Sequence, residues 1–126
     1  MEAAINVERD GPIEYMTLNR PDRGNMLTIP MVVELTERIV QAGRDRDLKA
    51  IVVTGAGENF CLGRDPEGAP EQAPKTALEM RSDLAAPILG FYAAVRSAEV
   101  PVIAVVRGLA NGFGCAAAAV CDVTIA

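Results

Sequence analysis

The 126-residue sequence predicts one α/β domain built on a mostly parallel sheet. Three observations support this fold class. Short β-branched runs alternate with segments of helical periodicity, which is the order of βαβ units. Two of those runs, 49–54 and 101–106, are almost continuously apolar, as strands buried on both faces are. Half of the residues are hydrophobic, which is enough to build a core in a chain of this length.

The chain is expected to open with an antiparallel hairpin. Residues 4–8 and 13–19 are β-like runs. Asp10-Gly11 between them suits a two-residue type I′ turn, which needs positive φ at both positions. Residues 20–25 are polar and contain proline and glycine, so they are expected to form a loop.

A helix is predicted to follow that loop. Thr28 is a suitable N-cap, and Pro30 is tolerated in a first helical turn because the amide there has no partner. Gly43 is the expected end of this helix, and residues 49–54 form the next strand. The apolar residues that recur at helical spacing are Val32, Leu35, Ile39 and Ala42.

The middle of the chain predicts a loop and then a second helix. Residues 66–74 contain three prolines and are expected to form a mobile loop. Thr76 and Glu79 fit a capping box, so a helix should begin there. Pro87 should kink or restart that helix, which continues to about Ala98. Its expected apolar face comprises Ile88, Leu89, Tyr92 and Val95.

The last part of the chain predicts one more βαβ unit. The strand at 101–106 leads into a glycine-bearing turn at 108–114. A short helix of small residues is expected at 115–120, and another strand begins at residue 123.

Composition excludes several classes of function. The sequence has no histidine, which removes Ser-His-Asp and Cys-His catalysis. Three scattered cysteines do not suit a zinc site, so no metal site is expected. No GxxxxGK[ST] motif is present, which excludes a P-loop. A net charge of −5 without a basic run argues against nucleic acid as a partner.

Other features bear on the compartment. No apolar run approaches the length of a membrane span, so no membrane partner is expected. The first residues lack the pattern of a signal peptide, and an odd number of cysteines suggests reduced thiols. These features together predict a cytoplasmic protein. Cys61, Cys115 and Cys121 are expected to be core residues rather than reactive ones.

Two turns are candidates for a functional site. Asp65 and Pro66 fit an N-cap and a first helical residue, and the turn at 108–114 leads into the helix at 115–120. Free backbone N–H groups at the N-terminus of a helix can bind an anion. Two helix N-termini that face each other can hold an oxyanion from both sides. For the glycines alone, tight turns that pack a strand on a helix are the simpler explanation. Asp65 could act as a general base, although helix capping is the favoured role.

The segment 112–117 also fits GxGxxA, a variant of the dinucleotide-binding turn. Two features weaken this interpretation. Several residues separate the preceding strand from the first glycine. The acidic residue expected about 20 positions later would lie beyond residue 126.

Five segments, taken in order, resemble the crotonase (enoyl-CoA hydratase/isomerase) superfamily. The resemblance covers nearly the whole chain. It implies a crotonase-like repeated ββα superhelix, acyl-coenzyme A thioesters as substrates and a homotrimer or hexamer. Coenzyme A then enters as part of the substrate, and no tightly bound cofactor is implied. The segments are L-N-R-P and N-M-L within 18–27, I-V-V-T-G-A-G at 51–57, F-C-L-G-R-D at 60–65, P-V-I-A-V-V-R-G at 101–108 and G-F-G-C with C-D within 112–122.

The resemblance also assigns roles to particular residues. Members of this family stabilise a thioester enolate or oxyanion with two backbone N–H groups, which correspond here to Arg64 and Phe113. Arg23 stands where the family often has a basic residue near the CoA phosphates, although a solvated loop charge would explain it equally well. The residues implied along the CoA path or beside the second N–H are Arg23, Met26, Leu62, Asp65, Pro66, Gly112 and Gly114.

The sequence departs from the family pattern at three positions. Phe113 replaces a usual glycine and is expected to reshape the acyl pocket, and Arg107 replaces a usual asparagine. Ala116 stands where hydratases place a catalytic glutamate, and alanine cannot transfer a proton. The second family glutamate would lie beyond residue 126. Because family domains are considerably longer, residues 1–126 are expected to be the N-terminal part of a crotonase-like domain, truncated at the C-terminus.

The sequence therefore predicts an acyl-CoA enzyme of the hydratase or isomerase type. Ala116 favours isomerase-like or other one-acid chemistry over hydration by two glutamates. A member that binds acyl-CoA or a sister subunit without turnover is the alternative. A nucleotide-binding domain that uses GxGxxA is a third interpretation. Glu67 and Glu71 could reach a pocket, but nothing selects them.

Overall fold

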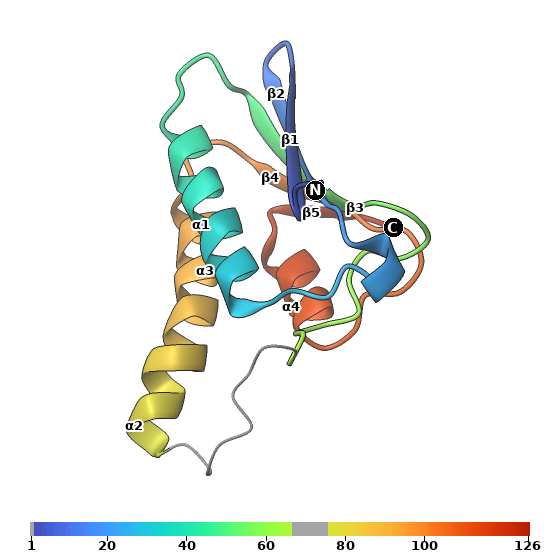
Figure 1. The fold of residues 1–126 in the computed structure, drawn as a ribbon. Helices are drawn as coiled ribbons and strands as arrows, with labels where there is room; N and C mark the ends of the chain where they lie inside the picture. Colours follow the sequence, from blue (N-terminus) through green and yellow to red (C-terminus); the bar gives the residue numbers. More distant parts are fainter. Residues whose placement is uncertain (1, 67–75) are drawn as a thin grey trace.

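Figure 1 shows the computed structural model, which describes residues 2–66 and 76–126. One five-stranded sheet in the order β1-β2-β3-β4-β5 forms a layer, and helices pack against it. The strands are β1 (Ile5–Asp10), β2 (Ile13–Leu18), β3 (Ala50–Gly55), β4 (Val102–Val105) and β5 (Val123–Ile125). The helices are α1 (Ile29–Gly43), α2 (Ala77–Met80), α3 (Ala86–Ser97) and α4 (Phe113–Val120), with a 3₁₀ turn η1 (Pro21–Arg23) and a π-helical stretch η2 (Arg81–Ala85).

The sheet is mostly parallel, as predicted. β1 pairs antiparallel with β2, and every later neighbour is parallel. Met16, Val53 and Ala104 lie in register across three strands and are buried in the core. Thr124 continues this row on β5, and its hydroxyl donates to the Ala118 carbonyl of α4 at 2.8 Å. The helices therefore cover this face of the sheet.

The predicted hairpin is present, but the predicted turn is wrong by one residue. Asp10 pairs with Ile13, so the two turn residues are Gly11 and Pro12. Gly11 has a φ of 57°, whereas the ring of Pro12 holds φ negative. Positive then negative φ is the pattern of a type II′ turn, in which glycine takes the first position.

The helix α1 begins where the sequence predicts. The Thr28 hydroxyl accepts a hydrogen bond from the Met31 N–H at 3.3 Å, and Pro30 lies in the first turn. The predicted apolar stripe is buried, together with Met31, so α1 packs on the core along this face. Residues 20–25, expected to be a loop, contain the short turn η1.

Both predicted features of the second helical segment are present. Thr76 and Glu79 form the complete capping box at the start of α2. A π-helical stretch precedes Pro87, which lacks the N–H that an α-helix would use, and α3 begins there. The predicted face is wrong at Leu89, whose exposed fraction is 62%. Val95 is buried as predicted, and Ile88 and Tyr92 are half-buried. Phe91 and Ala94 complete the buried side of α3, because α3 packs against both α1 and α4.

The C-terminal unit departs from the prediction at one boundary. α4 begins at Phe113 and not at residue 115, because Gly112 adopts a φ of 53° and turns the chain directly into the helix. The loop expected at 66–74 lies outside the described residues, apart from Pro66. Within residues 2–66 and 76–126, no helix is both long enough and apolar enough to span a membrane.

Candidate functional site

Two loop segments lie side by side beyond the carboxyl ends of β3 and β4. Cys61 and Ala110 form a parallel bridge, and the Asn111 N–H donates to the Cys61 carbonyl at 3.0 Å. Gly114 lies so close to this strand-like segment that a Cβ atom there would be 2.2 Å from the Cys61 carbonyl oxygen. Only glycine permits this approach, which explains its place in the second motif.

A second bridge holds the first motif against the loop that follows η1. Leu27 pairs with Arg64, so its N–H donates to the Gly63 carbonyl at 2.9 Å and its carbonyl accepts from the Asp65 N–H at 2.8 Å. Gly63 has a φ of 123°, a conformation that other residues rarely adopt. The segment 61–65 therefore runs between two neighbouring loops and is bonded to both.

The two N–H groups that the sequence singles out have no protein partner in the described part of the chain. Along this strand-like segment, successive backbone N–H groups point to opposite edges. The Asp65 N–H points toward Leu27, so the Arg64 N–H points away from Leu27. Phe113 is the first residue of α4, where backbone N–H groups have no intrahelical acceptor. Both donors are thus available to a ligand at the meeting of the two segments.

Phe113 fits at the helix start without strain. It does not have positive φ, and its ring packs against two aromatic residues of α3. The Phe113 and Phe91 ring centroids are 5.7 Å apart with an edge-on geometry, and the Tyr92 ring lies 6.0 Å from Phe113. The ring that replaces the usual glycine therefore joins α4 to α3.

Ala116 lies one turn further along α4. Its N–H donates to the Gly112 carbonyl at 3.2 Å, and its side chain is half-buried. A methyl group at this position supplies no proton donor or acceptor.

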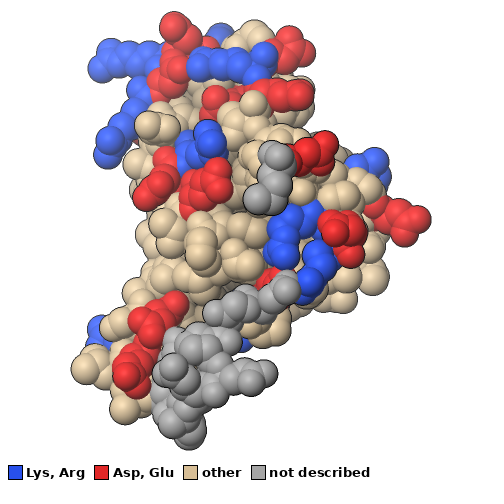
Figure 2. Space-filling model, in the orientation of Figure 1, with Lys and Arg blue, Asp and Glu red and all other residues tan. Residues whose placement is uncertain are grey.

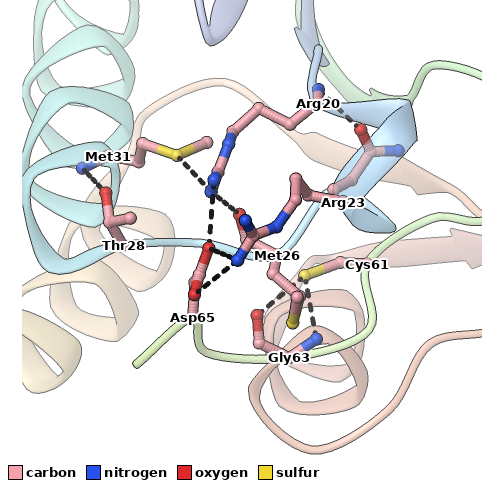
Figure 3. A network of polar contacts seen from close by, with 9 residues as sticks. Arg20, Arg23, Met26, Thr28, Met31, Cys61, Gly63 and Asp65 are labelled. Carbon is pink, nitrogen blue, oxygen red and sulfur yellow. Dashed lines mark hydrogen bonds and ion pairs between the residues drawn. The ribbon is translucent and has the colours of Figure 1, made fainter. Parts of the chain in front are cut away.

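Asp65 is a buried carboxylate held by two arginines (Figure 3). Its side chain is 1% exposed, and Oδ2 lies 3.0 Å from an Arg20 Nη atom and 3.4 Å from one of Arg23. The same guanidinium of Arg20 donates to the Met26 carbonyl at 2.8 Å. The carboxylate is therefore committed to ion pairs. The helical turn predicted to start after Asp65-Pro66 falls on residues outside the described ranges.

The other predicted residues of the CoA path gather around this carboxylate. Leu62 is half-buried, its N–H donates to the Gly24 carbonyl at 2.9 Å, and its side chain occupies the space that a Cβ at Gly24 would need. Met26 is half-buried and lies near Asp65 (Figure 3), and Pro66 is exposed. Residues 23–26 and 62–66, which are far apart in the sequence, thus form one side of the site, and Gly112 and Gly114 belong to the other.

Sequence reasoning missed the role of Asn25. Its side chain is fully buried: Nδ2 donates to the carbonyls of Ala56 and Asn59, each at 2.8 Å, and Oδ1 accepts from the Arg20 N–H at 2.9 Å. Asn25 also has a φ of 56°, which asparagine tolerates better than most residues. An asparagine after glycine in a polar turn is the signal that could have identified it.

The cysteines differ from one another. Burial raises the pKa of the Cys61 thiol, and burial with the nearby Asp122 carboxylate raises the pKa of Cys121 to about 11. Cys115 was expected to be a core residue, and this is wrong. It is exposed because α4 buries the other side, formed by Gly114, Ala117 and Ala118.

A hollow of about 620 Å³ lies away from this site. It is bounded by the carboxyl ends of α1 and α3 and by the residues that follow them, namely 43–46 with Leu48, and 97–100. Neither Arg64 nor Phe113 lines this hollow.

A family model described as enoyl-CoA hydratase/isomerase matches residues 8–126. The chain belongs to the enoyl-CoA hydratase/isomerase family. It is 38% identical over 122 residues to a probable enoyl-CoA hydratase of Mycobacterium tuberculosis, covering 97% of this chain and 45% of that protein. It is 34% identical over 123 residues to the (E)-benzylidenesuccinyl-CoA hydratase of Thauera aromatica, covering 97% of this chain and 46% of the relative.

Solved structures show the same relationship. The chain superposes on an enoyl-CoA hydratase from Mycobacterium smegmatis with a TM-score of 0.85 and 31% identity, covering 98% of this chain and 47% of the other. The crotonase-like fold is therefore confirmed, and the chain spans less than half the length of these relatives. As for the dinucleotide interpretation, β4 ends at Val105 while α4 begins at Phe113, so the glycine turn does not follow the strand directly.

Proposed function

We propose that this chain binds acyl-CoA thioesters and stabilises the enolate or oxyanion of the thioester with the N–H groups of Arg64 and Phe113. The observation that supports this most directly is a pair of N–H groups that have no partner among the described residues and lie on two segments bonded side by side. Family membership supports acyl-CoA as the ligand class. Coenzyme A would enter with the substrate and not as a resident cofactor.

Backbone donors suit this task because their direction is set before the substrate arrives. The bridge to Leu27 fixes the Arg64 N–H, and the first turn of α4 fixes the Phe113 N–H. Little reorganisation is therefore needed when charge develops on the thioester oxygen. Removing one such donor typically costs about 100- to 1,000-fold in rate. In this proposal the CoA moiety lies along Met26, Leu62 and Pro66, with Arg23 near its phosphates.

The proton transfer would differ from hydration by two glutamates. Ala116 cannot act as acid or base, so we propose isomerase-like or other one-acid chemistry for the protein, which would work as a homotrimer or hexamer. The same alanine favours a second candidate, a member that binds acyl-CoA or a sister subunit without turnover.

Two variants of Phe113 test the proposed donor. Phe113→Ala removes the ring and keeps the N–H, whereas Phe113→Pro removes both. Proline is tolerated at the first helical position, so α4 should still form. Acetoacetyl-CoA, which ionises to an absorbing enolate, is the probe. We expect the enolate signal to persist in Phe113→Ala and to fall about 100-fold in Phe113→Pro. Equal signals in both variants would exclude the Phe113 N–H as a donor.

Calorimetric titration with crotonyl-CoA, with product measured in the same sample, separates the two candidate functions. Binding with turnover supports an enzyme, and hydration at a normal enzymatic rate would refute the one-acid assignment. Binding without turnover supports the non-catalytic member. If the protein binds neither crotonyl-CoA nor acetoacetyl-CoA, and NAD raises its melting temperature, the acyl-CoA proposal fails and the GxGxxA interpretation gains support.

A further inference from the structure

Arg20, Asp65 and Arg23 form a group that is here called the arginine–aspartate cluster. The proposal above uses only Arg23 of this cluster, near the CoA phosphates, and gives Arg20 and Asp65 no task. Asp65 belongs to the segment after β3, whereas Arg20 is the N-cap of the η1 turn after β2 and Arg23 is its last residue (Figure 3). A carboxylate whose side chain is 1% exposed is costly to bury unless charged partners surround it. The cluster therefore ties two loops together at the point where they form one side of the site.

The main chain links this cluster to the Arg64 N–H. A planar trans peptide unit contains the Gly63 carbonyl and the Arg64 N–H, which point in opposite directions. Because the Leu27 N–H holds that carbonyl at 2.9 Å, the position of Leu27 decides where the Arg64 N–H points. The Asp65 N–H holds the carbonyl of Leu27 at 2.8 Å, so the next peptide unit is fixed in the same way.

Asp65 thus holds the 20–27 loop by both its main chain and its side chain. Its carboxylate pairs with Arg20, and Arg20 in turn donates to the carbonyl of Met26, the residue before Leu27. The connection forms a closed ring of contacts through Asp65, Arg20, Met26 and Leu27 and back to Asp65. These contacts hold the Gly63–Arg64 peptide from the side of the 20–27 loop.

We infer that Asp65 is a positioning residue that sets the direction of the Arg64 N–H through Arg20 and Leu27. This inference rests on the proposed function, because it gives that N–H a task. It predicts a specific asymmetry. Asp65→Asn leaves two arginines without their carboxylate, which adds positive charge beside the proposed path of the CoA phosphates. The variant should therefore bind CoA at least as well as the wild type while it stabilises the enolate less well.

The experiment compares Asp65→Asn with wild type, using CoA and acetoacetyl-CoA as probes. We expect CoA affinity to remain within about twofold or to increase, and the enolate signal of bound acetoacetyl-CoA to fall roughly 10- to 100-fold, since a displacement of about 1 Å can cost 100-fold. Asp22→Asn, which removes the same charge from an exposed position in η1, is the matched control and should change neither quantity.

A second measurement does not depend on activity. Amide hydrogen exchange of Leu27 and Asp65 should become faster in Asp65→Asn, while that of Val53 in β3 stays unchanged. If Asp65→Asn does not fold, Arg20→Lys takes its place. Lysine keeps the charge but lacks the fork that reaches both Asp65 and the Met26 carbonyl, so the same changes should appear in weaker form.

The outcomes separate this inference from the proposed function. Equal losses in CoA and enolate binding, or an unchanged enolate signal, would overturn the positioning role. If wild-type protein binds neither probe, the proposed function fails, and the exchange rates of Leu27 and Asp65 alone decide whether Asp65 orders this segment. Unchanged exchange at both amides would overturn the inference in every case.

Discussion

The ring of Phe113 shows how one residue can combine two roles. Its N–H lies at the proposed site, while its side chain packs on Phe91, which is 1% exposed, and on half-buried Tyr92. Edge-on aromatic pairs add about 0.5–1.5 kcal/mol beyond the area that they bury. The side chain is therefore expected to matter for stability, and the main chain for binding.

Phe113→Ala should lower the free energy of unfolding by about 1–3 kcal/mol, less than a fully buried phenylalanine would cost, because the ring is only half-buried. Urea denaturation followed by circular dichroism measures the difference. Leu89→Ala on α3 is the control, because a side chain with an exposed fraction of 62% should change stability by no more than about 0.5 kcal/mol. Equal losses in the two variants would show that the aromatic cluster does not form.

The three thiols should react with iodoacetamide in a defined order. Cys115 is exposed and should be alkylated first in the native protein. Cys121, whose pKa is raised to about 11, and buried Cys61, whose pKa is also raised, carry little thiolate near neutral pH. Because the raised pKa moves thiolate formation to higher pH, Cys121 should become reactive only under strongly alkaline conditions. Peptide mass spectrometry over a pH series checks this order, and early labelling of Cys61 would contradict it.

At the scale of elements, the start of α4 depends on how closely it approaches the segment after β3. A Cβ at Gly114 would lie 2.2 Å from the Cys61 carbonyl oxygen, which is main chain and cannot move aside cheaply. In contrast, a Cβ at Gly90 in α3 would meet nothing within 4 Å. These two helical glycines therefore form a natural pair for comparison.

Gly114→Ala should destabilise the fold by about 1–3 kcal/mol, as overpacking does, and should separate the two donors of the proposed site. Gly90→Ala should stabilise the fold by roughly 0.5–1 kcal/mol, since alanine has a higher helix propensity than glycine and its Cβ would meet no other atom. Thermal denaturation of both variants shows whether each substitution lowers or raises the melting temperature. A stabilising Gly114→Ala would mean that α4 does not approach Cys61 as described.

At the scale of the whole molecule, the helices of residues 2–66 and 76–126 pack on one face of the sheet and leave the other without a helix. Tyr15, Val52 and Ile103 lie in register on it and are half-buried, and Val123 and Ile125 at the edge strand β5 are 48% and 54% exposed. Figure 2, which views the molecule from the side of the helices, shows charged side chains gathered toward the hairpin end. An exposed apolar edge strand favours association.

We expect the purified 126-residue chain to associate as its concentration rises, and the double substitution Val123→Lys with Ile125→Lys to reduce this association. Sedimentation velocity over a concentration series measures it. Leu78→Lys on α2 is the control, since Leu78 is exposed but lies far from β5 in the fold. Association that persists in the double variant and disappears in the control would place the contact elsewhere.

Local sequence signals were sufficient for most elements. The Thr28 cap, the Thr76 and Glu79 capping box and the position of Pro87 depend on residues within a turn of one another, so the sequence predicts them directly. The order of β-branched runs and helical segments was likewise sufficient for the mostly parallel sheet. The same holds for the motifs that carry the family resemblance, which the match over residues 8–126 confirms.

Tertiary structure decided what depends on contacts between distant segments. The turn at Gly11-Pro12, the exposure of Leu89 and Cys115 and the ion pairs of Asp65 follow from strand register and helix packing, which no local pattern encodes. The availability of the Arg64 N–H follows from its bridge to Leu27, formed across two loops. The sequence by itself thus determined the fold family and predicted the residues of a candidate site. The packing of two loops determined which main-chain groups of those residues have no partner among the described residues, because a hydrogen bond depends on both of its partners.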